Sequence, residues 1–117
     1  MTARALIVDD DKDFLETLAK RMQKRGIKVF AAEPATVEMK LFEIESCDAV
    51  LIDLMMPETG GIETLQIICK KFPEIKVLII SGHPSIARRV EALKLGATDF
   101  IPKPIDFDYL MDMVKQV

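Results

Sequence analysis

Four short stretches of the sequence carry side chains suited to handling a phosphoryl group. Three consecutive acids, Asp9–Asp11, follow one apolar run, and Asp53 follows another. Ser81 and Lys103 come after two later apolar stretches. Clustered carboxylates repel one another unless a cation joins them, and a hard divalent cation is their natural partner. Mg²⁺ commonly takes one or two carboxylates together with phosphate oxygens and water, so it is the expected cofactor.

The remaining side chains of this set suggest how the chemistry would run. An aspartate carboxylate such as Asp53 can itself be a nucleophile and form an aspartyl-phosphate. The charge of Lys103 and the hydroxyl of Ser81 could neutralise the oxygens of a transferring phosphoryl group. Each residue also has a simpler interpretation, because Asp11 can merely cap a helix and Lys103 can be a solvated loop charge. No single residue is specific, but the ordered set is.

Alternating strands and helices predict how the four stretches meet. Apolar runs predict strands, and residues recurring every three or four positions, such as Phe14, Leu18 and Met22, predict helices. The strands are expected at residues 5–8, 27–31, 49–52, 76–80 and 99–101, and the helices at 12–24, from 34 onward, 62–71, 84–95 and 106–116.

Strands separated by helices imply a parallel sheet that is covered on both faces. Five such units predict an α/β, doubly wound, flavodoxin-like fold with five parallel strands in the order 2-1-3-4-5. In such folds the ligand lies beyond the carboxyl ends of the strands, near strands 1 and 3. All four stretches would then converge on one edge of the sheet.

Composition narrows the class of protein. The 117 residues fit one domain, half of them are hydrophobic, 30% are charged, and the net charge is −3. Without a cluster of Lys and Arg, direct nucleic-acid contact is not expected, and the apolar runs are too short for a membrane span. A cytoplasmic location follows as the default. Cys47 and Cys69 are expected to be reduced, partly buried thiols.

The four stretches resemble the response regulator receiver family of two-component signalling. The matching segments are LIVDDD (residues 6–11), VLIDLMMPETGG (50–61), VLIISG (77–82) and LGATDFIPKP (95–104). Their spacing agrees with the family along nearly the whole chain. The resemblance implies a signalling switch that assists only its own phosphorylation and dephosphorylation, rather than an enzyme with a separate substrate.

The resemblance also assigns roles to single residues. Asp53 would be the phosphorylated residue, Ser81 and Lys103 would bind the phosphoryl group, and Phe100 would be the aromatic that moves when Ser81 shifts. The metal ligands would be Asp9, Asp10, Asp53 and the backbone carbonyl of Met55. The Lys103–Pro104 peptide would be cis.

At two places the sequence has residues that are less usual in the receiver family. Pro102 precedes Lys103 where a strand residue is more common, which predicts a short or edge strand. Met55 and His83 occupy the variable positions that tune dephosphorylation in the family. Because Met55 cannot orient a water molecule, slow self-dephosphorylation is expected.

The implied partners are a histidine kinase or phosphotransfer protein as phosphoryl donor, and an output domain or target protein. Phosphorylation would switch the surface built by residues 84–95, 99–101 and 106–116. Homodimerisation through this surface stays open, as does the choice between a stand-alone regulator and a fragment of a longer one. Two alternatives remain: a haloacid-dehalogenase-like phosphatase with Asp9 as nucleophile, and a receiver-like scaffold that is never phosphorylated.

Overall fold

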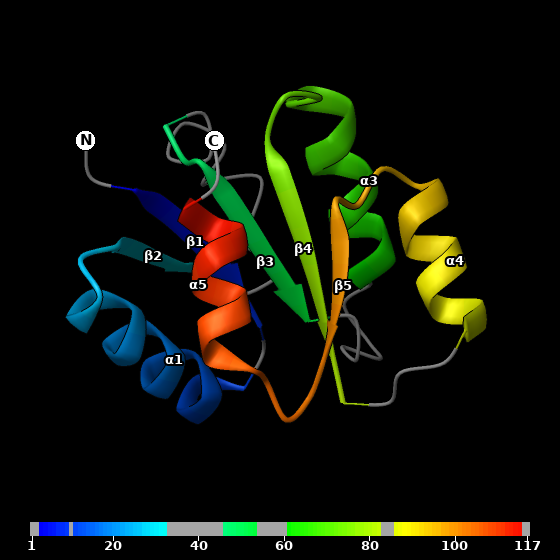
Figure 1. Cartoon of the computed structure of the whole chain (residues 1–117). Coiled ribbons are helices and arrows are strands. Elements are labelled where there is room, and N and C mark those ends of the chain that lie inside the picture. The colour runs from blue at the N-terminus through cyan, green and yellow to red at the C-terminus, as the bar shows by residue number, and fades with distance from the viewer. Residues whose placement is uncertain (1–2, 10, 33–45, 54–60, 83–85, 116–117) are drawn as a thin grey trace.

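A five-stranded parallel β-sheet organises the molecule (Figure 1). The computed structural model describes residues 3–9, 11–32, 46–53, 61–82 and 86–115. The strands are β1 (Arg4–Val8), β2 (Lys28–Ala32), β3 (Ala49–Asp53), β4 (Lys76–Ser81) and β5 (Asp99–Pro102). Their order is β2-β1-β3-β4-β5, and all four neighbouring pairs are parallel. The predicted flavodoxin-like order is therefore confirmed.

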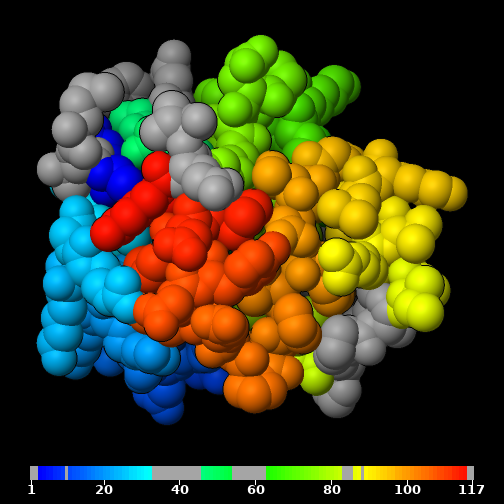
Figure 2. All heavy atoms as spheres, viewed as in Figure 1, coloured from blue at the N-terminus to red at the C-terminus, as the bar shows by residue number. Residues whose placement is uncertain are grey.

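Helices cover both faces of this sheet, as predicted. They are α1 (Lys12–Lys24), α3 (Gly61–Lys71), α4 (Ile86–Lys94) and α5 (Phe107–Lys115). Helices α1 and α5 lie on one face, and α3 and α4 lie on the other (Figure 1). Seen as spheres, the side chains of α5 lie between those of α1 and those of α4 (Figure 2). The helix expected from Pro34 onward falls within residues 33–45, outside the described residues.

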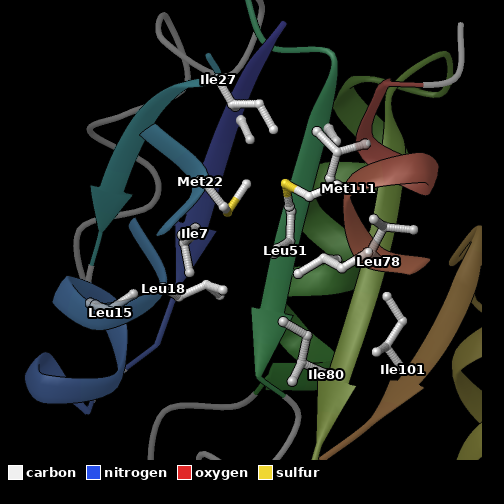
Figure 3. Packing of buried hydrophobic residues seen from close by; sticks show 14 residues of the cluster. Ile7, Leu15, Leu18, Met22, Ile27, Leu51, Leu78, Ile80, Ile101 and Met111 are labelled. Atoms are coloured by element: carbon white, nitrogen blue, oxygen red, sulfur yellow. The ribbon is translucent and has the colours of Figure 1, made fainter. Parts of the chain in front are cut away.

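Strand alternation explains the two layers of the core. Successive residues of a strand point to opposite faces, so a fully buried strand serves both layers. In β3, Leu51 faces α1 and α5, where it packs with residues that include Met22 and Met111 (Figure 3). Its neighbours Val50 and Ile52 belong to the other layer, with Leu65 and Ile68 of α3 and Ala92 of α4.

The element ends deviate from the sequence prediction by one or two residues. Strand β2 begins at Lys28 rather than residue 27, because the turn through Gly26, at φ 83°, still includes Ile27. Helix α5 begins at Phe107, and Asp106 caps it by accepting a hydrogen bond from the Tyr109 N–H at 3.1 Å.

Strand β5 confirms the expectation drawn from Pro102. It has four residues, lies at the edge of the sheet and ends at Pro102. A proline without an N–H fits such an edge position. The peptide bond between Lys103 and Pro104 is cis, as the resemblance implied.

Two further expectations concern membranes and thiols. None of the described helices is long and apolar enough to cross a bilayer. Cys47 is buried, Cys69 is partly buried, and both are free thiols, as expected. Burial raises the pKa of the Cys69 thiol above its ordinary value.

Candidate functional site

The carboxyl ends of four strands bring the predicted site residues to one edge of the sheet. Asp9 follows β1, Asp53 ends β3, Ser81 ends β4 and Lys103 follows β5. These ends lie at the lower edge of Figure 1. Strands β1 and β3 are direct neighbours, with Val8 opposite Ile52, so Asp9 and Asp53 occupy adjacent positions beyond this pair. The convergence inferred from strand order is present.

Asp53 and Lys103 form a shielded ion pair. The Lys103 ammonium lies 2.9 Å from Asp53 Oδ2 and donates a hydrogen bond to it. The Asp53 side chain is 8% exposed and that of Lys103 is 28% exposed. Low exposure strengthens such a pair relative to one on the surface. The backbone N–H of Lys103 also donates to the Ser81 carbonyl at 2.8 Å, which ties the lysine to the end of β4.

Asp9 is a buried carboxylate whose charge is only partly compensated. Its Oδ1 accepts a hydrogen bond from the Asp11 N–H at 2.9 Å. Its Oδ2 is buried and receives no hydrogen bond from the described residues. The pKa of Asp9 is raised from 3.8 to about 7, chiefly by burial and further by the nearby Asp53, while the Asp11 N–H and Lys103 oppose the rise.

This electrostatic situation fits a bound divalent cation. A buried carboxylate oxygen without a donor, beside a second carboxylate, is the kind of hard oxygen ligand that Mg²⁺ prefers. The expected ligands Asp10 and Met55, and the variable residue His83, lie outside the described residues. Within the described part of the chain, no three His, Cys, Asp or Glu side chains form a cluster that could hold a metal by themselves.

Asp11 has the structural role that its sequence position favoured. Its Oδ1 accepts a hydrogen bond from the Phe14 N–H at 3.1 Å, and Asp11 is therefore the N-cap of α1. A carboxylate at this end also interacts favourably with the helix dipole. The acids after β1 thus have different positions: Asp9 points into the buried edge, and Asp11 stabilises the helix.

The two expected switch residues, Ser81 and Phe100, are buried. Ser81 is fully buried at the end of β4, and Phe100 in β5 is 4% exposed. They lie in the same strand pair, where Ser81 is opposite Pro102. The Phe100 ring packs in the layer between the sheet and helices α3 and α4. Ser81 and Phe100 therefore lie on two hydrogen-bonded strands at one edge of the sheet.

Two features of this region were missed from the sequence. The Phe14 ring lies under the Lys103 ammonium, which is 4.1 Å from the ring centroid. Asp99 accepts a hydrogen bond from the Tyr109 hydroxyl and lies 3.9 Å from an Arg89 guanidinium nitrogen, so it joins α4, β5 and α5. The hydrogen bond to Asp99 raises the pKa of Tyr109. No local pattern in the sequence points to either contact.

Comparison with known proteins points in the same direction as the geometry. The family model of the response regulator receiver domain matches residues 5–115. The photosynthetic apparatus regulatory protein RegA of Rhodobacter capsulatus is 35% identical over 101 residues, which are 86% of this chain. A putative NtrX-like response regulator of Rickettsia typhi is 34% identical over 113 residues, or 95% of this chain.

Solved structures agree with this result. A response regulator protein from Burkholderia pseudomallei, described with a phosphorylated aspartic acid, a calcium ion and citrate, matches with a TM-score of 0.86 and 27% identity, over 97% of this chain and 67% of its own. A CheY-like receiver domain protein from Methanospirillum hungatei matches with a TM-score of 0.83 and 31% identity, over 98% and 92% of the two chains.

The matched region is only part of the curated relatives. This chain spans 55% of the length of the Rhodobacter capsulatus protein and 24% of that of the Rickettsia typhi protein. The similarity therefore concerns the region that carries the acids and the lysine, and not the whole length of those regulators.

Proposed function

Because this chain belongs to the response regulator receiver family, we propose that it is a signalling switch whose phosphoryl acceptor is Asp53. The observation that carries this proposal is the shielded pair of Asp53 and Lys103, 2.9 Å apart at the carboxyl edge of the sheet. Asp53 ends a central strand, next to Asp9, whose buried Oδ2 lacks a donor among the described residues. An acceptor carboxylate needs this combination of partial shielding and nearby positive charge.

In the proposed phosphoryl transfer, one bond to phosphorus forms and one breaks. One Asp53 carboxylate oxygen attacks the phosphorus, and a new O–P bond forms. The bond from phosphorus to the donor breaks, and the donor takes its electron pair. With a histidine kinase or a phosphotransfer protein as donor, the broken bond is the P–N bond of a phosphohistidine. Lys103 loses its contact with one carboxylate oxygen and gains one with the phosphoryl oxygens.

Mg²⁺ is the proposed cofactor of this step. Asp9 and Asp53 would contribute carboxylate oxygens, and the resemblance adds Asp10 and the Met55 carbonyl, which lie outside the described residues. Bound there, Mg²⁺ would neutralise negative charge on the phosphoryl oxygens. The support is the buried Oδ2 of Asp9, which lacks a donor among the described residues, and the raised pKa of this carboxyl.

Ser81 and Phe100 are the proposed switch. The phosphoryl group would draw the Ser81 hydroxyl and Lys103 toward it, and Phe100 would respond through β5. The surface of α4, β5 and α5 would then change its equilibrium between two arrangements. The burial of both residues at the same strand pair supports this assignment, because a small shift of one must move packed neighbours.

The partners follow from the family. A kinase or phosphotransfer protein would act in the cytoplasm as donor, and an output domain or a separate target protein would read the α4–β5–α5 surface. A homodimer formed through that surface is one form such reading can take. Because the matched relatives are longer than this chain, their outputs are not transferred to it.

Intact-mass spectrometry after incubation with Mg²⁺ and acetyl phosphate tests the proposal. We expect one added phosphoryl group on the unmodified protein, and none on Asp53→Asn or when EDTA removes the metal. Circular dichroism establishes that Asp53→Asn is folded. A label that persists in Asp53→Asn and vanishes in Asp9→Asn would favour the phosphatase alternative. No label from acetyl phosphate or from a phosphohistidine donor would favour the scaffold.

A further inference from the structure

The Lys103 ammonium has two neighbours that together determine its position. It lies 2.9 Å from Asp53 Oδ2 and 4.1 Å from the centroid of the Phe14 ring. A cation over an aromatic face is attracted to the ring, most strongly where water is partly excluded. Because the Lys103 side chain is only 28% exposed, the contact lies in a partly dehydrated place. The ammonium is therefore held between a charge and a ring.

The start of α1 fixes the ring. Asp9 Oδ1 accepts the Asp11 N–H, and Asp11 Oδ1 in turn accepts the Phe14 N–H. Phe14 also packs against the apolar layer between the sheet and helices α1 and α5. The Phe14 ring thus belongs to the first turn of a capped helix. Two hydrogen bonds in succession link the backbone of that turn to Asp11 and Asp9. A change in that turn or in that packing would move the ring relative to Lys103.

The other side of Lys103 is bounded by backbone. Its N–H is bonded to the Ser81 carbonyl, and a Cβ at Gly82 would lie 3.6 Å from the Lys103 Cδ atom. Beyond the ring, Phe14, Lys103 and Pro104 line a groove of about 310 Å³ between α1 and the connection from β5 to α5. In Figure 1 these two segments meet at the lower edge of the molecule. Without the ring, the flexible lysine chain would have room to turn into this groove.

We infer that Phe14 is a positioning residue for phosphoryl transfer, and that its ring face holds the Lys103 ammonium directed at Asp53. The inference rests on the proposed function, because it concerns how fast Asp53 is phosphorylated. A lysine side chain has four flexible torsions and loses substantial rotamer entropy when it is fixed. The ring reduces that loss before the phosphoryl group arrives, because the ammonium is already in place.

A ring that serves only as core packing is the competing explanation, and the chain provides matched variants to separate the two. Phe14→Leu keeps an apolar side chain and removes the ring, whereas Phe14→Tyr keeps the ring. Phe107→Leu is the control. Phe107 packs against the same apolar layer, and its ring centroid lies 4.1 Å from the Arg21 guanidinium carbon, whereas Lys103 lies over Phe14.

Two measurements complete the test. The first is the rate of phosphorylation by acetyl phosphate at saturating Mg²⁺, with thermal unfolding of each variant to establish folding. The second is the NMR shift of the Lys103 ε-methylene group, which the Phe14 ring beneath it should move upfield. We expect Phe14→Leu to react about fivefold more slowly and to lose this shift, as the loss of a cation–π contact predicts. Phe14→Tyr should restore both, and Phe107→Leu should change neither.

The outcomes separate this inference from the proposed function. If the unmodified protein is labelled and Phe14→Leu reacts as fast as Phe107→Leu, the inference is wrong and the acceptor role stands. If Phe14→Tyr reacts as slowly as Phe14→Leu, the ring face is not what matters and the inference is also wrong. An unmodified protein that takes no phosphoryl group from any donor would overturn both.

Discussion

The two ends of the sheet handle charge differently. At the amino end, Asp48 Oδ2 accepts the Arg4 N–H at 2.8 Å, and the Lys76 ammonium donates to the Met113 carbonyl. At the carboxyl end, Asp9 Oδ2 is buried without a donor among the described residues. At the amino end, these polar groups are paired within the chain. The carboxyl end keeps a buried carboxylate oxygen that a cation would satisfy, which supports the site proposed there.

The largest expected contrast between the two ends is in the rate of phosphorylation. Lys103→Ala should slow labelling by acetyl phosphate about 10²-fold, because a preorganised positive charge next to the transferring group is lost. Lys76→Ala should leave the rate within about twofold, since it is remote from Asp53. It should instead lower the free energy of unfolding by about 1–2 kcal/mol, through the lost hydrogen bond to Met113 and lost packing.

Labelling kinetics and urea unfolding of both variants check this contrast. Asp53→Asn serves as the unlabelled control in the kinetic series. Equal slowing by Lys76→Ala and Lys103→Ala would mean that the rate reports global stability, and the assignment of separate roles to the two ends would fail.

The second contrast concerns stability without metal. Asp9→Asn should raise the free energy of unfolding by about 2 kcal/mol at pH 8 in EDTA, because it removes a buried charge and keeps an acceptor for the Asp11 N–H. Asp48→Asn keeps an acceptor at an exposed position and should change stability by less than about 0.5 kcal/mol. Urea unfolding of both variants beside the unmodified protein measures this. A destabilised Asp9→Asn would show that the Asp9 charge is already compensated.

The stability gain of Asp9→Asn should depend on pH in a defined direction. The folded protein holds a proton on Asp9 up to about pH 7, whereas the unfolded chain releases it near 3.8. Between these values the folded state binds more protons, so stability falls as pH rises and levels off above about pH 7. The difference between Asp9→Asn and the unmodified protein should therefore shrink at pH 5 to about a third of its value at pH 8.

Urea unfolding in EDTA at pH 5 and pH 8 measures this dependence, and taking the difference between the two proteins removes the titration of groups remote from Asp9. A difference that is the same at both pH values would mean that Asp9 titrates in its ordinary range.

The fold and the convergence of the site could be predicted because both depend on periodic patterns. Apolar runs separated by amphipathic helices determine a parallel sheet, and a parallel sheet brings Asp9, Asp53, Ser81 and Lys103 to one edge. The N-caps at Asp11 and Asp106 follow local rules and were also predictable. Element ends were less accurate, as at β2, since turns such as the one through Gly26 extend beyond the pattern.

Contacts between distant side chains could not be predicted in this way. Helical periodicity places Phe14 on the apolar side of α1, but it does not say that the ring lies under Lys103. The same holds for Asp99, whose contacts with Tyr109 and Arg89 depend on how α4 and α5 sit beside β5. These contacts are set by the packing of whole elements, and a single sequence carries no local pattern for them.

The smallest contrast lies at the carboxyl end of the sheet, between the N-cap residues of α1 and α5. Asp11→Ala and Asp106→Ala each remove one N-cap hydrogen bond, so each should lower the free energy of unfolding by about 1 kcal/mol. Only Asp11→Ala should also slow phosphorylation, by about two- to threefold, because Asp11 holds the turn that carries Phe14 and adjoins Asp9. Urea unfolding and acetyl phosphate kinetics on the same samples check both. Equal losses of stability with unequal rates would mean that the rate responds to the local geometry of the α1 start. Equal slowing by both variants would instead assign it to general loosening of the domain.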